Sequence, residues 1–253
     1  METTRHQGRT AVVTGVGNGI GRATLLRLAQ EGATVTGCDV SAEALEDSAR
    51  ALADAGLTAK LVRADVTSQA DVDSLIAEAG PRVDILASVA GIMDFFLPLA
   101  DTDDATWDRV MAVNLTGVMR LTRAVIPLMQ ANGGGAIVTV ASKASTGAGA
   151  SGAAYTASKH GVIGLVRSVA YFYGPDNIRS NAVLPGSIGE TAIGTTAAPR
   201  VPWAMERAAT TIAVSPPPGH PDQVAAVISW LGTDEASYVN GALVSVDGGW
   251  AAA

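Results

Sequence analysis

Seven short runs of apolar, mostly β-branched residues recur along the chain, separated by glycine, polar and charged residues. Runs of this length that are apolar throughout are typical of strands buried on both faces of a sheet. We expect strands at Thr10–Thr14, Ala33–Cys38, Ala59–Ala64, Val83–Val89, Gly135–Ala141, Ile178–Leu184 and Ala242–Val246.

Longer segments rich in Ala and Leu separate the strands and predict helices. Ser41 and Ser68 are expected N-caps, and Gly174-Pro175 is a helix stop signal. The expected helices cover about Gly19–Glu31, the segments after Ser41 and Ser68, Asp103–Ala131, Ala153–Tyr173 and Pro221–Leu231. Alternating strands and helices predict an α/β fold, a doubly wound parallel sheet of about seven strands with helices on both faces. We expect one domain over residues 1–253, with ligands bound beyond the carboxyl ends of the strands.

One segment interrupts this alternation. Gly186–Gly219 is rich in Ala, Thr, Ser and Pro and is long for a connection within a compact domain. We expect it to be a substrate-binding loop that carries short helices. With the small residues of Ala144–Ala154, its apolar side chains predict a mainly apolar pocket, and they are Ile188, Ile193, Trp203, Met205 and Ile212.

Composition narrows the function. The 253 residues are 48% hydrophobic but only 4% aromatic, and the net charge of −7 argues against a nucleic-acid partner. The polar N-terminus and the lack of a long apolar stretch predict neither a signal peptide nor a membrane span, so we expect a cytoplasmic protein. Cys38, the one cysteine, cannot form an intrachain disulfide. The three histidines lack ligand spacing, so no catalytic metal is expected.

A glycine-rich loop joins the first strand to the first helix. Thr14–Gly21 has the spacing TGxxxGxG, in which Gly15, Gly19 and Gly21 are the glycines that recur. Glycines allow a tight turn and let backbone N–H groups approach a pyrophosphate, whose charge the helix N-terminus favours. The alternative is a β–α turn without a ligand, but its place after the first strand favours the cofactor site.

Asp39 follows the second strand, where a carboxylate can bind the adenosine ribose hydroxyls. It would repel a 2′-phosphate, and no Arg or Lys stands beside it in sequence, Arg22 being the nearest candidate. The sequence therefore predicts NAD rather than NADP. Asp65, after the third strand, has two open interpretations, a hydrogen bond to the adenine amino group or a simple cap of the strand end.

Four residues indicate chemistry at a hydroxyl or carbonyl group. Tyr155 and Lys159 lie four apart at the start of a helix, where the ammonium favours the phenolate and lowers the tyrosine pKa. A phenol held this way can exchange a proton with an alcohol oxygen. Ser142 ends a buried strand and can hydrogen-bond the reacting oxygen. Asn114 is unfavourable within a helix, so its side chain is expected to do local work, such as holding a water.

Together these residues resemble the classical short-chain dehydrogenase/reductase family over essentially the whole chain. The endings Tyr238–Gly241 and Val246–Gly249 also match. The resemblance implies a Rossmann-type fold, pro-S hydride transfer and a homotetramer. It makes Tyr155 the general acid/base, supported by Lys159, Ser142 and a water held by Asn114 in a proton relay. The implied cofactor-binding residues are Gly15, Asn18, Gly19, Ile20, Gly21, Asp39, Asp65, Val66, Ala90, Gly91, Tyr155, Lys159, Pro185, Gly186 and Ile188.

Three positions depart from the family pattern. Ser88-Val89 replaces the common Asn-Asn before Ala90-Gly91, and the threonine that usually follows Pro-Gly is shifted to Thr191. Lys143, directly after Ser142, is expected to point to solvent or to meet an anionic substrate group.

Three functions remain open. The first is an NAD(H)-dependent oxidoreductase that interconverts a secondary alcohol and a ketone, with a mainly apolar small-molecule substrate. The second is a 3-oxoacyl-[acyl-carrier-protein] reductase, which Asp39 and the acidic balance disfavour. The third is a non-catalytic NAD-binding regulatory protein, which has no need of a poised tyrosine.

Overall fold

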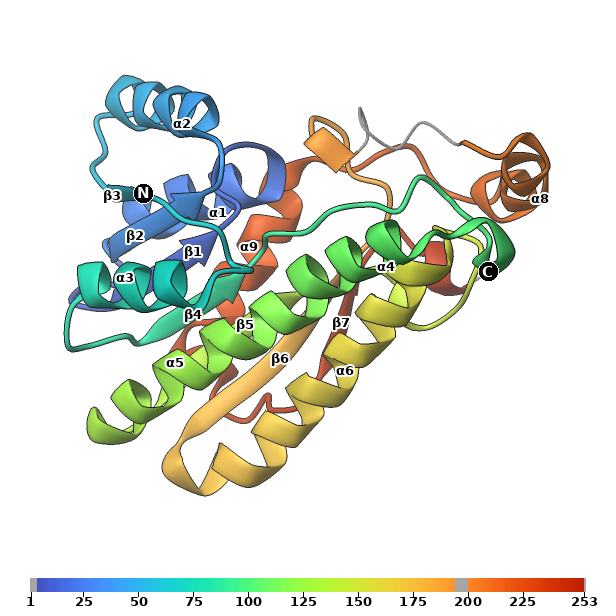
Figure 1. The fold of residues 1–253 in the computed structure, drawn as a ribbon. Coiled ribbons are helices and arrows are strands. Elements are labelled where there is room, and N and C mark those ends of the chain that lie inside the picture. The colour runs from blue at the N-terminus through green and yellow to red at the C-terminus, as the bar shows by residue number, and fades with distance from the viewer. Residues whose placement is uncertain (1–3, 194–199, 253) are drawn as a thin grey trace.

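The computed structural model describes residues 4–193 and 200–252 and contains one seven-stranded sheet, all parallel, in the order β3-β2-β1-β4-β5-β6-β7 (Figure 1). The strands are β1 (Thr10–Thr14), β2 (Thr34–Asp39), β3 (Lys60–Arg63), β4 (Ile85–Ser88), β5 (Gly135–Val140), β6 (Ile178–Pro185) and β7 (Leu243–Val246). This confirms the predicted doubly wound α/β sheet. The strand ends differ from prediction by two residues or fewer, and Asp39 is the last residue of β2 rather than the first after it.

The helices are α1 (Gly19–Gln30), α2 (Ala42–Asp54), α3 (Gln69–Ala79), α4 (Asp104–Met111), α5 (Val118–Ala131), α6 (Ala153–Tyr173), α8 (Pro202–Ile212) and α9 (Pro221–Leu231). The predicted N-caps are confirmed, since Ser41 and Ser68 accept hydrogen bonds from backbone amides of α2 and α3. Helix α6 ends before Gly174, as predicted. The left-handed residue that reverses the chain is Asn177, with φ of 58°, after a short 3-10 turn.

The helix predicted for Asp103–Ala131 is present and runs from Asp104 to Ala131, but its middle is not α-helical. Between α4 and α5, residues Ala112–Gly117 form a π-helix that carries Asn114. The amide of Asn114 bonds outside its own helix, accepting from Ile92 N at 2.9 Å and donating to Ile92 O at 3.0 Å. These bonds favour the widened turn, which periodicity could not reveal because Ile92 lies 22 residues away in sequence.

Both faces of the sheet are covered (Figure 1). Helices α1, α2 and α9 pack on one face, and α3, α5 and α6 pack on the other. Neighbouring residues Val12 and Val13 of β1, both 0% exposed, point into the two separate cores. Burial on both sides explains why the strands are apolar throughout rather than alternating.

The order of strands positions the site. The chain moves outward from β1 through β2 to β3, then returns to β4 on the other side of β1 and continues to β7. The reversal between β1 and β4 leaves a crevice at their carboxyl ends, where ligands of such sheets bind. The glycine loop follows β1, Val89–Gly91 follows β4, Ser142 follows β5 and Gly186 follows β6.

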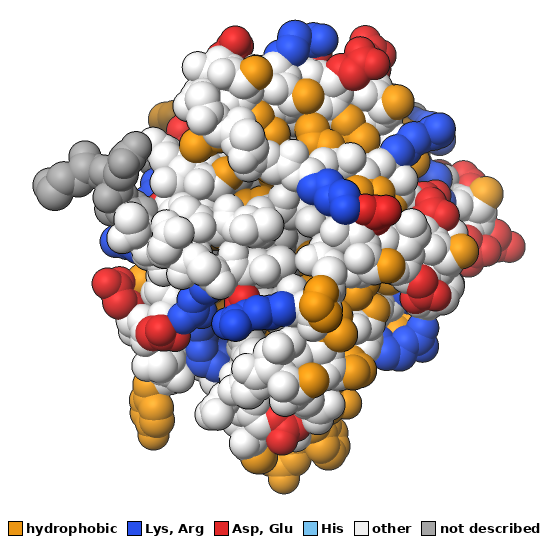
Figure 2. All heavy atoms as spheres, turned by 90° about the vertical axis from the view of Figure 1, so that its left-hand side faces the viewer, with side chains coloured by type: hydrophobic (Ala, Val, Ile, Leu, Met, Phe, Trp, Pro, Cys, Tyr) orange, Lys and Arg blue, Asp and Glu red, His pale blue; other side chains and the backbone are white. Residues whose placement is uncertain are grey.

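The surface carries charges of both signs. On the face drawn in Figure 2, Lys and Arg side chains are interspersed with Asp and Glu and form no continuous basic stripe. None of the helices within residues 4–193 and 200–252 is long and apolar enough to cross a membrane.

A buried polar cluster holds the N-terminal segment against the end of the molecule opposite the crevice. His6 is 0% exposed, and its Nε2 lies 3.1 Å from Ser229 Oγ and 3.5 Å from Glu31 Oε2. Ser229 Oγ also donates to Glu31, and Nδ1 of His6 has no hydrogen-bond partner among the described residues. Burial, with the nearby Arg9 and Arg5, lowers the pKa of His6 below its usual value of 6.5, although Glu31 opposes this.

This cluster predicts a loss of stability in mild acid. Because the folded-state pKa of His6 is depressed, protons bind preferentially to the unfolded chain as the pH falls below 6.5. The free energy of unfolding should therefore decrease below that pH, by at most about 1.4 kcal/mol per pH unit from this group. Urea denaturation between pH 5 and 8 should show a flatter dependence in His6→Gln. His160→Gln, at an exposed imidazole, is the control, and an equal slope in all three proteins would contradict the prediction.

Candidate active site

The glycine loop is shaped by close backbone contacts. Gly15 has φ of +71°, and a Cβ there would lie 2.9 Å from the Cα of Ala90, in the segment after β4. A Cβ on Gly21 would lie 1.9 Å from the carbonyl oxygen of Gly15, so α1 starts directly against the loop. The TGxxxGxG spacing therefore allows β1, α1 and the segment after β4 to meet without side chains between them. The amides of Gly15, Val16 and Gly17 bond to Cys38 O and Asp39 Oδ2, so the N-terminus of α1 is the part of the loop that can bind an anion.

Asp39 lies beside this loop. Its Oδ2 accepts from Gly17 N at 2.9 Å and its Oδ1 from Ser41 N at 3.0 Å. Two arginines flank it. Arg22 donates to Gly17 O and to Ser48 Oγ, whereas Arg63, which sequence reasoning did not consider, donates from Nε to Val40 O at 3.1 Å. The carboxylate thus lines the cavity at the end of β2, and both guanidinium groups are already hydrogen-bonded to the chain.

Asp65 caps a turn. Its Oδ1 accepts from both the backbone amide and the hydroxyl of Thr67, each at 2.8 Å. The structure therefore shows the capping role that the sequence left open. Asp65 and the neighbouring Val66 also line the cavity, so contact with a ligand remains geometrically available.

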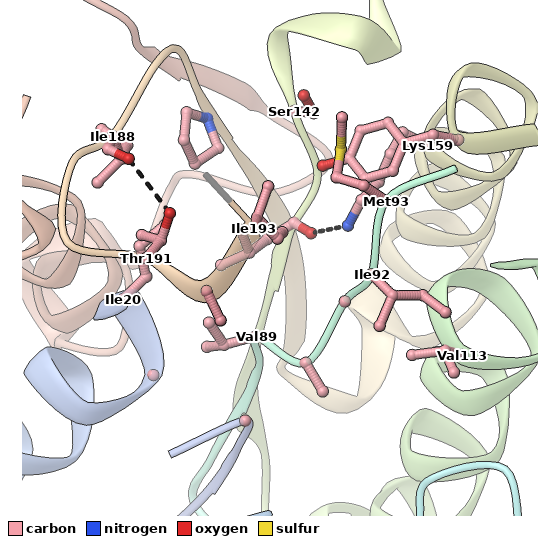
Figure 3. A pocket seen from close by; sticks show the side chains of 18 of the residues that line it. Ile20, Val89, Ile92, Met93, Val113, Ser142, Lys159, Ile188, Thr191 and Ile193 are labelled. Atoms are coloured by element: carbon pink, nitrogen blue, oxygen red, sulfur yellow. Dashed lines mark hydrogen bonds between the residues drawn. The ribbon is translucent and has the colours of Figure 1, made fainter. Parts of the chain in front are cut away.

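Tyr155, Lys159 and Ser142 converge at the carboxyl ends of β5 and β6. Tyr155 is 6% exposed and Lys159 is 3% exposed, and the lysine Nζ lies 5.6 Å from the centre of the tyrosine ring. Lys159 Nζ donates to Val140 O at 2.8 Å, at the end of β5 (Figure 3). Ser142 follows β5 and lies at the same side of the cavity as Lys159 and Met93 (Figure 3). The strand end and one helix face therefore bring the predicted residues together.

Burial dominates the ionisation of this pair. It raises the pKa of Tyr155 to about 12, against a hydrogen bond with Ser142 that lowers it, while the charge of Asp94 raises it further. Burial also lowers the pKa of Lys159 to about 8. The tyrosine pKa thus moves in the direction opposite to the sequence expectation, because desolvation outweighs the hydrogen bond with Ser142.

Asn114 lies next to this pair. It is 0% exposed, and its Nδ2 donates to Ser158 Oγ at 3.2 Å in addition to Ile92 O. A Cβ added to Gly91 would lie 3.4 Å from Asn114 Oδ1 and 3.5 Å from Lys159 Nζ. Gly91 therefore leaves a small polar space between the two side chains, of the kind that suits a bridging water.

The cavity has a volume of about 810 Å³ and includes the glycine loop, Asp39 and Tyr155 in one continuous wall. Its apolar wall includes Met93, Phe96, Ile188, Ile193, Ile212 and Trp250. Figure 3 shows Ile188 and Thr191 on the side of α1, opposite Met93 and Lys159, with Ile193 between them. A dinucleotide and a small substrate could share a cavity of this size.

The predicted loop contributes less of this wall than expected. Ile188, Ile193 and Ile212 line the cavity, but Trp203 and Met205 do not. Helix α8 buries Ala204 and Ala208 instead, which leaves Trp203 58% exposed. Gly194–Pro199 of this loop lies outside the described residues.

Trp250 is a lining residue that sequence reasoning missed. It is 7% exposed, and its Nε1 donates to Thr211 O at 2.9 Å, at the end of α8. The Nζ of the half-buried Lys143 lies 5.2 Å from the Trp250 ring centre, so the lysine also contacts an aromatic ring, which the sequence did not predict. The sequence feature that could have indicated this role is the position of a tryptophan directly after Gly248-Gly249.

The other two departures from the family pattern also have structural consequences. Ser88 is 2% exposed and its Oγ has no partner among the described residues, so the side-chain bonds of the usual asparagine have no counterpart here. Thr191 donates to Ile188 O at 3.2 Å, and its Cγ2 would lie 2.8 Å from a Cβ on Gly19. The loop after β6 therefore packs directly on the glycine loop. Within the described ranges, no cluster of His, Cys, Asp and Glu could hold a metal ion.

Comparisons with known proteins agree with this geometry. A family model described as enoyl-(acyl carrier protein) reductase matches residues 15–251. The 3β-hydroxysteroid dehydrogenase 2 of Eggerthella lenta is 38% identical over 100% of both chains. The cis-4-hydroxycyclohexanecarboxylate dehydrogenase of Sinomonas cyclohexanicum is 41% identical over 96% of this chain and 97% of that protein.

The chain belongs to the short-chain dehydrogenase/reductase family. A candidate NAD(P)-dependent gluconate 5-dehydrogenase from Beutenbergia cavernae, solved with bound NADP, is similar in structure. Its TM-score is 0.87 at 35% identity, over 99% of each chain. Members of this family bind a nicotinamide cofactor. The cradle of Gly15 and Gly21 fits such a group in this short-chain dehydrogenase/reductase, because a Cβ at either glycine would meet backbone atoms.

The close contacts of the glycine loop predict that an alanine substitution has different effects at two glycines that both lie in helices. Gly21→Ala should weaken NADH binding at least about tenfold, because its Cβ meets the Gly15 carbonyl and displaces the loop. Gly164→Ala in α6 meets nothing within 4 Å and should raise the melting temperature slightly through helix propensity. NADH fluorescence titration and thermal melts of both variants check this. Unchanged NADH affinity in Gly21→Ala would show that the loop does not hold the cofactor.

Proposed function

We propose that this protein is an NAD(H)-dependent oxidoreductase that interconverts a secondary alcohol and a ketone, with Tyr155 as general acid/base. The observation that carries the proposal is one cavity lined by both the glycine loop and the group of Tyr155, Lys159 and Ser142. Membership of a family of alcohol and ketone oxidoreductases supports the reaction class. Asp39 and the glycine loop would hold the adenosine and pyrophosphate parts of a dinucleotide, and Tyr155 and Lys159 line the part of the cavity left for its nicotinamide.

The chain's own residues supply the proton chemistry. In the oxidation direction, Tyr155 removes the proton from the alcohol oxygen while Ser142 donates a hydrogen bond to that oxygen and orients it. A nicotinamide cofactor, when bound, supplies or accepts the hydride, and its cationic oxidised form favours the phenolate. Lys159 adds positive charge beside the ring and also binds the nicotinamide ribose. Asn114 holds a water that passes the proton from Lys159 toward solvent.

The same proposal assigns the cofactor as NAD. Asp39 accepts the ribose hydroxyls and repels a 2′-phosphate, and the hydrogen bonds of Arg22 and Arg63 to the chain compete with any phosphate. The remaining contacts to the cofactor are assigned to residues that all lie at this edge of the sheet. They are Asn18 and Ile20 in the glycine loop, Asp65 and Val66 after β3, Ala90 and Gly91 after β4, and Pro185, Gly186 and Ile188 at the end of β6 and after it.

The substrate class follows from the wall of the cavity and from the relatives. Met93, Phe96 and Ile193 present apolar surface beside Tyr155. Two relatives are named for a hydroxysteroid and a hydroxycyclohexane, in which the reacting hydroxyl is borne by an aliphatic ring. We therefore assign a secondary alcohol on an aliphatic ring as the preferred substrate.

The quaternary structure proposed is a homotetramer. Tyr171 and Phe172, at the end of α6, are 78% and 69% exposed and stack edge to face with ring centres 5.2 Å apart. Large apolar side chains exposed side by side are typical of subunit contacts.

Turnover of NAD⁺ with cyclohexanols and hydroxysteroids, followed at the NADH absorbance, tests the main proposal. Tyr155→Phe should lower kcat at least about 100-fold through loss of the general base while the affinity for NADH stays within a few-fold. The Tyr238→Phe variant, at a fully exposed ring, serves as a control and should keep full activity. Binding of NADH without turnover of any alcohol, ketone or 3-oxoacyl thioester would instead support the regulatory alternative.

The cofactor assignment has its own test. The wild-type enzyme should have a higher kcat/KM with NADH than with NADPH. Asp39→Ser removes the repulsive carboxylate while Arg22 and Arg63 remain, and should shift the NADPH/NADH ratio of kcat/KM by about 10- to 100-fold toward NADPH. Glu46→Ser, on the exposed side of α2, is the control. A wild-type preference for NADPH would overturn the assignment and favour the 3-oxoacyl reductase alternative.

A further inference from the structure

The segment after β4 crosses the N-terminus of the helix that carries Tyr155. Asp94, in this segment, is 0% exposed and accepts two hydrogen bonds from α6 amides, Oδ1 from Gly152 N at 3.0 Å and Oδ2 from Tyr155 N at 2.8 Å. Leu97 O accepts from Ala153 N at 2.9 Å. Helix α6 has no side-chain cap of its own, so a segment distant in sequence satisfies its first amides.

The contact between this segment and α6 is tight. A Cβ on Gly152 would lie 2.5 Å from Leu97 N and 2.6 Å from Asp94 Oδ2. Only a glycine leaves space for the carboxylate to reach the helix end, where the helix dipole favours a negative charge. The cap therefore depends on the close approach of the Asp94–Leu97 segment to the backbone of Gly152. A long side chain folded over the helix from the surface could not replace it.

Backbone strain lies beside the cap. Phe95 and Phe96 both have left-handed conformations, with φ of 58° and 56°, which cost about 1–3 kcal/mol each in a non-glycine residue. The Phe95 ring is covered by the guanidinium groups of Arg200, at 3.7 Å, and Arg109, at 5.7 Å. The bonds of Asp94 and these cation–π contacts hold the turn in place.

The turn points its other side chains at the cavity. Met93 and Phe96 line the wall beside Tyr155 and belong to the same apolar cluster as its ring. Asp94 lies between these two residues in sequence, and its carboxylate accepts the hydrogen bond of the Tyr155 amide. The wall of the pocket and the acid/base helix are thus joined at a single carboxylate.

We propose that Asp94 is a positioning residue that holds Tyr155 and the Met93–Phe96 wall in one rigid unit, so that a substrate seated on the wall has its hydroxyl in reach of the phenol. The inference rests on the proposed function of Tyr155. No sequence pattern assigned a role to Asp94, since its partners lie 58 and 61 residues away.

The charge of Asp94 has a second effect. Charged groups reach Tyr155 from two elements among the described residues: Asp94 from the segment after β4, which raises its pKa, and Lys159 from α6, with Nζ 5.6 Å from the ring centre. Ser142 contributes a neutral hydroxyl from the end of β5. Removing the negative charge lowers the tyrosine pKa, which favours the phenolate, while removing the hydrogen bonds loosens the tyrosine. The lowered tyrosine pKa favours alcohol oxidation, whereas the lost hydrogen bonds disfavour it. Variants that remove the charge alone, or both the charge and the hydrogen bonds, can therefore distinguish the two effects.

The test compares Asp94→Asn and Asp94→Ala with Asp84→Asn. Asp84 is also a buried carboxylate that accepts a backbone amide, from Thr10 at 2.8 Å, but it lies at the opposite edge of the sheet. We expect kcat at optimal pH to fall about 10- to 100-fold in Asp94→Ala and less in Asp94→Asn, with NADH affinity unchanged. The acid limb of the oxidation pH profile should move to lower pH in Asp94→Asn. Asp84→Asn should lose stability with no change in either quantity.

Two readouts need no turnover. Hydrogen exchange should speed up at the start of α6 in both Asp94 variants and not in its later turns. The chain has four tyrosines, so the ¹³C-tyrosine NMR signal of Tyr155, assigned with Tyr155→Phe, should shift in the Asp94 variants only. If the wild type turns over no alcohol, the proposed function fails, and these two readouts still decide whether Asp94 positions Tyr155. Unchanged exchange and tyrosine signal, or an unchanged kcat and pH profile in folded variants, would overturn the inference.

Discussion

Burial of both faces of the sheet is the constraint on which the rest of this molecule depends. With α1, α2 and α9 on one side and α3, α5 and α6 on the other, the cavity that collects the polar groups of the site lies where the strands end. The reversal of strand order between β1 and β4 opens the carboxyl edge, and the glycines of the loop after β1 let three backbones meet there. The glycine loop and Tyr155 therefore line one cavity at this edge of the sheet.

The same burial sets the chemistry of the catalytic group. Tyr155 and Lys159 are nearly inaccessible, and desolvation moves their pKa values apart, to about 12 for the tyrosine and about 8 for the lysine. A phenol with a raised pKa is a weak base until positive charge approaches it. The cationic ring of an oxidised nicotinamide cofactor would bring such charge, so under the proposed mechanism proton removal by Tyr155 would depend on occupancy of the cofactor site.

Local patterns in the sequence were enough for most of the frame. Apolar runs located all seven strands, and Ser41 and Ser68 marked two helix starts, because these signals act over a few residues. The errors have one cause. The π-helix at Asn114 depends on Ile92, the outward turn of Trp203 depends on which side of α8 finds a partner, and the pocket role of Trp250 depends on Thr211. Each needs a partner distant in sequence, which no local pattern contains.

The residues proposed for the chemistry and those proposed for substrate specificity are held by different contacts between distant parts of the chain. Tyr155 is fixed from inside the fold, by Asp94 after β4 and by Ser142 after β5. The loop after β6 instead rests on the outside of the site, through Thr191 on Gly19 and Thr211 on Trp250. Changes in that loop can reshape the pocket without moving the acid/base. A family that includes proteins named for a hydroxysteroid and for a hydroxycyclohexanecarboxylate needs such a frame, in which the pocket can change while Tyr155 stays in place.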